Sequence, residues 1–150
     1  MFNSDLDALV PMLCITLTAL ATMGTEAFRG RNERLPIGWW GLIGLGGAAL
    51  SAALLWNRNV EGFDVIVADN FGLFVTFILI IVGALTIMFS SQIVYRDDMP
   101  PGEYYALVLF GIVGMIMMAT ATDLLVIFIA LEILSLAVYV LTGKIGRAHV

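Results

Sequence analysis

The sequence predicts an all-α, polytopic transmembrane helix bundle with five spans. Of its 150 residues, 61% are hydrophobic and 13% are charged, and the mean hydropathy is +1.00. A chain this apolar has too few polar residues to cover the surface of a soluble domain. Its apolar residues also form runs close to the roughly 20 residues that a helix needs to cross a hydrocarbon core about 30 Å thick. These runs cover about residues 8–28, 37–56, 71–95, 104–121 and 124–143.

The first run, residues 8–28, follows an acidic segment rather than the positive leader of a signal peptide, so we expect it to stay in the mature protein. Pro11 falls in its opening turn, where a missing amide hydrogen is tolerated. Cys14, the single cysteine, cannot form an internal disulfide and is interpreted as a packing residue.

The second run, residues 37–56, carries Gly44, Ala48 and Ala52 at four-residue intervals. Small residues at this spacing let helix backbones approach closely in lipid, so this helix is predicted to be buried among others. Tryptophans at both of its ends are typical of rings anchored at the headgroup level. The connector that follows is too short to span, and its portion 63–67 is predicted to lie extended outside the membrane.

The third run contains no charge, and the Pro100-Pro101 pair after it forbids helix continuation. The fourth and fifth runs are joined only by Thr122 and Asp123, so they must be antiparallel neighbours. Asp123 is well placed to cap the fifth helix.

Basic residues are distributed unequally between the two sides of the predicted bundle. One side holds Arg58 alone, while the side of the C-terminus holds Arg29, Arg31, Arg34, Arg96, Lys144 and Arg147. Because basic loops stay in the cytoplasm, we predict that the N-terminus is outside and the C-terminus cytoplasmic.

Residues 145–150 form a segment of a different kind. One reverse translation of this segment matches the start of a common sequencing adapter, so we interpret it as a read-through artefact. His149, the single histidine, is therefore left out of functional reasoning.

Glu132 is the residue for which the sequence predicts a function. It lies near the middle of the fifth run, where an acidic side chain costs roughly 2.5 to 3.5 kcal/mol on the insertion scale for Asp. Helical periodicity joins it to Ser135, Tyr139 and Thr142 in one polar stripe. In a structural interpretation, Glu132 stays protonated and hydrogen-bonds to a neighbouring helix to help the helices pack. In the functional interpretation, which we favour, it is a proton-relay carboxylate.

The other polar residues are better explained by structure. Glu26 lies three residues before Arg29, which favours a solvated interfacial ion pair. The net charge of -5 excludes a nucleic-acid partner, and no nucleotide-binding, redox or metal motif is found. We therefore expect no cofactor or metal bound by this chain.

Ordered motifs along the chain resemble the antiporter-like subunits of respiratory complex I. They are Asp69–Phe74, Glu103–Phe110, Gly114–Leu125 and Phe128–Leu136, with Tyr139 to Leu141 after them. The Glu-Ile-Leu-Ser-Leu form at 132–136, with Tyr139, is most similar to subunit N of the bacterial proton-pumping NADH:quinone oxidoreductase. Subunits L and M and the sodium/proton antiporter subunits share the central glutamate but usually differ around it.

The resemblance implies a role in proton translocation through the membrane arm of that complex, in the bacterial inner membrane. Glu132 would be the functional glutamate, with its partner lysine on a later helix. NADH and quinone would be used by the whole complex and not held by this chain. Residues 1–95 would then form three N-terminal helices with a packing and docking role. Residues 104–143 would be the first two helices of the antiporter-like proton-channel repeat, which is truncated here. The chain therefore resembles an N-terminal fragment. The expected partners are the lipid bilayer and the other membrane-arm subunits. The alternatives are an L/M-type or sodium/proton antiporter subunit, or a docking module only.

The orientation can be checked by cysteine labelling. Cysteines placed at Asp5 and Lys144 should react with a membrane-impermeant maleimide from the outside and from the cytoplasm respectively, because the basic residues gather on the side of Lys144. The opposite labelling pattern would overturn the prediction.

Overall fold

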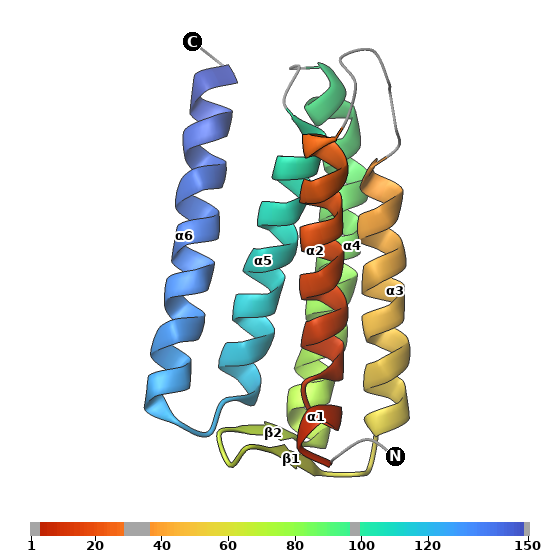
Figure 1. Cartoon of the computed structure of the whole chain (residues 1–150), viewed down its shortest axis with the longest axis vertical. Helices are drawn as coiled ribbons and strands as arrows, with labels where there is room; N and C mark the ends of the chain where they lie inside the picture. The colour runs from red at the N-terminus through yellow and green to blue at the C-terminus, as the bar shows by residue number, and fades with distance from the viewer. Residues whose placement is uncertain (1–3, 29–36, 97–99, 149–150) are drawn as a thin grey trace.

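The computed structural model describes residues 4–28, 37–96 and 100–148, and in this part of the chain five long helices form an antiparallel bundle (Figure 1). They are α2 (Val10–Ala27), α3 (Ile37–Leu55), α4 (Asn70–Arg96), α5 (Pro101–Thr120) and α6 (Leu124–Ala148). A short helix, α1 (Ser4–Asp7), precedes them. Each long helix contains a window apolar enough to cross a membrane, so the five predicted spans are confirmed.

The helix ends follow local chemistry. α4 begins after Asp69, whose Oδ1 accepts a hydrogen bond from Gly72 N at 2.7 Å, and α6 begins after Asp123, whose Oδ1 accepts one from Leu125 N at 2.8 Å. Both bonds satisfy amide groups that the first helical turn leaves without partners. The predicted cap by Asp123 is therefore confirmed. α5 begins at Pro101, earlier than the predicted start at 104, because proline is well suited to the first helical position.

α5 lies at the centre of the bundle, and α6 lies at its edge. In α5, 56% of the span is buried inside the bundle, against 11% in α6. The core forms around the buried α5 side chains of Tyr105, Leu109, Ile112 and Ile116. α2, α4 and α6 all pack against α5, which makes it the common partner of the bundle.

The small residues of α3 are buried inside the chain. Ala48 and Ala52 have no exposed surface, and a Cβ atom on Gly44 would lie 2.1 Å from Thr18 Oγ1 of α2. The burial of this face agrees with the small-residue spacing. The prediction that the whole helix is buried among others is wrong for the described chain, because only 28% of the α3 span is buried and Ile43, Leu50 and Leu54 are each 65% exposed. The face is occupied within the chain, so it is not a surface on which a neighbouring subunit could dock.

A two-stranded hairpin connects α3 and α4 at the opposite end from the C-terminus (Figure 1). Its antiparallel strands are β1 (Val60–Gly62) and β2 (Ile66–Ala68). Phe63 and Asp64 form the turn with φ angles of 53° and 58°, a conformation that a bulky residue rarely adopts. The sequence predicted one extended segment over 63–67, whereas only Ile66 and Val67 of it lie in a strand.

The hairpin holds the link between α5 and α6. Thr122 donates its amide hydrogen to Val65 O at 2.9 Å and its hydroxyl hydrogen to Asp64 O at 3.1 Å, and Ala121 forms a bridge with Ile66. These bonds tie the start of α6 to a connector 58 residues earlier in the chain.

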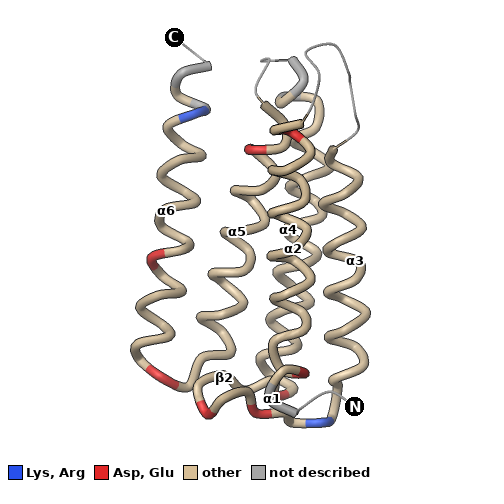
Figure 2. The backbone as a smooth tube through the Cα atoms, viewed as in Figure 1, with Lys and Arg blue, Asp and Glu red and all other residues tan. Residues whose placement is uncertain are grey.

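Charged residues gather at the two ends of the bundle, as Figure 2 shows, although α6 also carries an acidic residue part-way along its length. The expected ion pair between Glu26 and Arg29 lies outside the described residues, because Arg29 belongs to the connector 29–36. Glu26 Oε2 accepts a hydrogen bond from Gly102 N at 3.0 Å, which joins the end of α2 to the start of α5.

The contact at Gly44 predicts that substitution of Gly44 and of Gly47, two glycines of α3, will affect stability differently. Gly44→Leu should lower the melting temperature in detergent, with a loss of stability of about 1–3 kcal/mol or more, because the new side chain overlaps Thr18. Gly47→Leu is the matched control, since Gly47 is exposed and nothing lies within 4 Å of its Cβ position. Equal effects of the two substitutions would contradict the packing of α2 on α3.

Candidate functional site

The candidate site is the middle of α6. Glu132 is the single acidic residue of this helix and lies about 12 Å along its axis from Leu124, at a rise of 1.5 Å per residue. This distance is close to half the thickness of a hydrocarbon core of about 30 Å. The carboxylate therefore lies near the level of the membrane midplane.

The packing of α6 on α5 is closest at Gly114, and Gly111 lies on the same face of α5. A Cβ atom on Gly114 would lie 2.9 Å from Ala130 O and 3.0 Å from Leu134 N, so only a glycine allows the two backbones to come this close. One turn away, a Cβ atom on Gly111 would lie 3.9 Å from Ala137 Cβ. The face of α6 that meets α5 therefore runs through Ala130, Leu134 and Ala137.

Glu132 lies on the opposite face. Two residues along a helix correspond to about 200°, and Glu132 is two residues from both Ala130 and Leu134. Its side chain is exposed, whereas Ala130 has no exposed surface. In the described part of the chain, the Glu132 carboxylate has no hydrogen-bond or ion-pair partner.

The face around Glu132 is broad and apolar. Its exposed side chains include Leu125, Phe128, Leu131, Leu136, Tyr139 and Val140. Their exposed fractions range from 45% for Val140 to 70% for Tyr139. α6 thus presents to its surroundings an apolar surface with one carboxylate at its centre.

The predicted polar stripe is distributed unevenly on this face. Tyr139 and Thr142 are exposed like Glu132, while Ser135 is half-buried. Thr142 donates its hydroxyl hydrogen to carbonyl oxygens of its own helix, 3.0 Å from Val138 O and from Tyr139 O. None of the three residues contacts the Glu132 carboxylate through a hydrogen bond within the described chain.

An ion pair at the other end of α6 was not predicted from the sequence. Lys144 of α6 pairs with Glu103 in the first turn of α5, and both side chains are partly exposed, 29% and 44% respectively. The signal available in the sequence was the short link between two antiparallel spans, which places the end of one beside the start of the other. With the hairpin bonds to Thr122, this pair holds α6 at both ends.

Within the described residues, the arrangement supplies one mid-membrane carboxylate and no cluster of side chains that could hold a metal ion. Among residues 4–28, 37–96 and 100–148, no three His, Cys, Asp or Glu side chains lie close enough to hold a metal ion together. A lone carboxylate can take up or release a proton, or pair with a cation brought to it. These are the chemical steps that the described residues offer at this site.

Curated proteins similar to this chain share one printed name. The chain is 34% identical over 93% of its length to the NADH-quinone oxidoreductase subunit N of Trichlorobacter lovleyi, and 36% identical over 96% to that of Dehalococcoides mccartyi. A subunit N 1 of Herpetosiphon aurantiacus is 45% identical over 68% of the chain. The chain spans about three tenths of the length of the first two relatives, 29% and 30%. No protein-family model matches it.

Disulfide trapping can test which face of α6 meets α5. In a Cys14→Ala background, the pair Gly111→Cys and Ala137→Cys should cross-link rapidly under mild oxidation, because the Cβ atoms would lie 3.9 Å apart, within the range of a disulfide. The matched pair Gly111→Cys and Tyr139→Cys should not, since Tyr139 lies at nearly the same level as Ala137 but about 200° around the helix and is 70% exposed. Mobility on a non-reducing gel reports the result, and cross-linking of the Tyr139 pair alone would mean that α6 is rotated.

Proposed function

The chain is homologous to NADH-quinone oxidoreductase subunit N over nearly its whole length, and on this premise we propose that it contributes to proton translocation in the membrane arm of that enzyme. Its five spans make it a multi-pass membrane protein, and its bacterial relatives indicate the inner membrane. Within this proposal Glu132 is the carboxylate that carries a proton or pairs with a mobile cation.

The observation that carries the proposal is the position of Glu132 on the outward face of α6. An acid at this depth in contact with lipid costs roughly 2.5 to 3.5 kcal/mol on the insertion scale and more by other estimates. The surface around it is exposed in this part of the chain. A partner must therefore come from other helices, and the resemblance implies a lysine on a later helix of the same subunit.

The partner lysine would make Glu132 responsive to its surroundings. When a cation lies beside the carboxylate, the ionised form is favoured, and when the cation moves away, the protonated form is favoured. Movement of the partner charge would thus drive proton uptake and release at the midplane. NADH and quinone would be used elsewhere in the complex, and the coupling would reach Glu132 through conformation or electrostatics.

A second candidate function is a sodium/proton antiporter subunit, which the shared central glutamate favours. The two differ in the ion that the transport reaction requires. Transport by a sodium/proton antiporter subunit would depend on sodium, whereas pumping by the proposed subunit would not.

The proposed role predicts a loss of pumping without a loss of assembly. In the full-length subunit, Glu132→Gln and Glu132→Ala should reduce proton pumping by inverted vesicles several-fold per NADH oxidised, because the mid-membrane proton site is removed. The complex should assemble, since the Glu132 side chain is exposed and contributes nothing to the α5 contact.

Glu61→Gln is the matched control, because Glu61 is an exposed carboxylate in the hairpin, outside the spans. It should leave pumping unchanged. Normal pumping by both Glu132 variants would rule out the assigned role, and pumping that requires sodium would favour the antiporter function.

A further inference from the structure

The link between α5 and α6 extends the hairpin sheet at the free edge of β2. Ala121 forms an antiparallel bridge with Ile66. Thr122 donates its amide hydrogen to Val65 O at 2.9 Å and its hydroxyl hydrogen to Asp64 O at 3.1 Å. These attachments fall on two consecutive residues just before α6. The start of α6 is therefore fixed to the hairpin by backbone and side chain together.

The hairpin is itself fixed to the body of the bundle. Ile66 and Ala68 of β2 are 5% and 2% exposed, and they belong to the hydrophobic clusters formed by α2, α3, α4 and α5. At the base of the hairpin, Asn57 N donates to Asn70 Oδ1 and Asn70 Nδ2 donates to Asn57 Oδ1, both at 3.0 Å. A residue bonded to β2 is thus held relative to four helices and not to α5 alone.

The hairpin turn has a backbone conformation that its sequence does not favour. Val65 N donates to Gly62 O at 3.2 Å, and Phe63 and Asp64 between them both have positive φ angles. Turns with two left-handed central residues favour Asn-Gly, and a bulky residue rarely adopts this conformation. Contacts explain the turn better, since the carbonyl oxygens of Asp64 and Val65 both accept hydrogen bonds from Thr122. The turn and the link therefore hold each other in place.

The polar contacts at the two ends of α6 differ in stiffness. Thr122 is held through its main-chain amide and a short β-branched side chain with a restricted χ1 angle. Lys144 reaches Glu103 through a long flexible side chain, and both partners are partly exposed. The pair can follow a small shift of α6 along its axis, whereas the bonds of Thr122 cannot.

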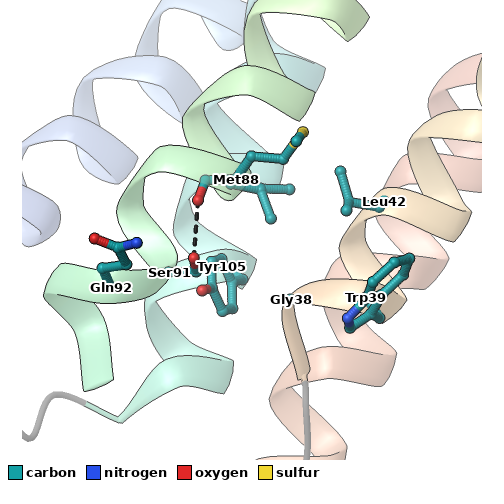
Figure 3. A pocket seen from close by; sticks show the side chains of 8 residues that line it. Gly38, Trp39, Leu42, Met88, Ser91, Gln92 and Tyr105 are labelled. Atoms are coloured by element: carbon teal, nitrogen blue, oxygen red, sulfur yellow. Dashed lines mark hydrogen bonds between the residues drawn. The ribbon is translucent and has the colours of Figure 1, made fainter. Parts of the chain in front are cut away.

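The hairpin end of the bundle is also closed more tightly. There the rings of Trp56 and Phe77 lie with their centroids 6.0 Å apart, joining the end of α3 to α4. At the opposite end, a groove of about 450 Å³ lies between α3 and α4, with Gly38, Trp39 and Met88 in its lining (Figure 3). α6 is thus held most stiffly at the end where the bundle is closed.

Packing along the span fixes the facing sides of α5 and α6 more strictly than their level. Gly114 of α5 meets Ala130 and Leu134, and Gly111 meets Leu134 and Ala137. Contacts between small and apolar groups determine how closely the backbones approach, but they are less directional than hydrogen bonds. The level of α6 along its axis is therefore set chiefly by the bonds at its start.

We propose that Thr122 is a positioning residue that sets the level of Glu132 in the membrane by fixing the start of α6 to the hairpin turn. Glu132 lies about 15 Å along the axis from Thr122 at a rise of 1.5 Å per residue. Because α6 is a continuous helix, a shift at its start moves Glu132 by the same amount. The inference rests on the proposed function of Glu132, and it adds a residue outside the span to the parts that this function requires.

A ladder of cysteine pairs can measure the level of α6. In a cysteine-free form of the full-length subunit in membranes, Gly111→Cys is combined with Leu134→Cys, Ala137→Cys or Leu141→Cys, which lie at successive turns of one α6 face. The Ala137 pair should cross-link fastest, because its Cβ atoms would lie 3.9 Å apart. A shift of α6 along its axis should slow this pair and speed a neighbouring one.

Substitutions of Thr122 should shift this pattern in a graded way. Thr122→Val removes the hydroxyl and should slow the Ala137 pair several-fold. Thr122→Pro also removes the amide hydrogen and should slow it further, and Ala121 already has the extended conformation that a residue before proline takes, with φ -70° and ψ 138°. Thr122→Ser keeps both donors and should keep the original pattern.

Two control variants separate this role from its alternatives. Lys144→Gln should leave the Ala137 pair fastest, because the flexible ion pair does not set the level. Phe63→Asn combined with Asp64→Gly should also leave the pattern unchanged, since it keeps both carbonyl oxygens and supplies the residues that this turn favours. A pattern that shifts as much in Lys144→Gln as in Thr122→Pro would overturn the proposal.

Proton pumping by the assembled complex connects the level of α6 with function. Thr122→Val should lower pumping per NADH oxidised several-fold, Thr122→Ser should restore it, and Thr122→Val added to Glu132→Gln should cause no further loss. An unchanged ladder in an assembled Thr122→Pro complex would overturn the proposal even if Glu132 carries protons. A shifted ladder with normal pumping in Thr122→Val would also overturn it. Normal pumping in Glu132→Gln with a shifted ladder would instead remove the proposed function and leave the control of the level by Thr122 supported.

Discussion

The close approach of α5 and α6 at Gly114 determines which way the face of α6 that carries Glu132 points. In lipid, helices associate through packing and not through burial from water, so small residues decide where two backbones can meet. At Gly114 the α6 backbone leaves no room even for a Cβ atom. A helix held by this face can present only its opposite face to other partners, and that face carries Glu132.

Contacts at both ends support this central packing. At one end, Thr122 is bonded to the hairpin turn, and at the other, Lys144 pairs with Glu103. α6 buries little of its surface in the bundle, so these polar contacts contribute more to its placement than they would for a central helix such as α5. They resist both sliding and rotation of α6, and either motion would change the level and the direction of Glu132.

Much of the fold could be predicted from the sequence, because the length of an apolar run has a direct meaning in a bilayer. The spans, the cap by Asp123 and the burial of the Gly44 face all follow from local patterns. The hairpin could not be predicted, since its bonds to Thr122 join segments far apart in the chain and its turn places Phe63 at a positive φ. The direction of Glu132 could not be predicted either, because periodicity groups the polar residues of α6 on one face but does not say whether that face meets α5 or another partner.

The exposed carboxylate and the exposed apolar face around it make opposite demands on the environment. Lipid would suit Phe128 and Leu136 but not Glu132, and water would suit Glu132 but not its neighbours. A protein surface that is mostly apolar, with one polar or cationic group at its centre, satisfies both. In the relatives, most of the subunit lies outside the matched region, so such a surface is to be sought there. Under the proposed function, a cation on that surface would have to lie at the level of Glu132, because an unpaired charge at this depth is costly.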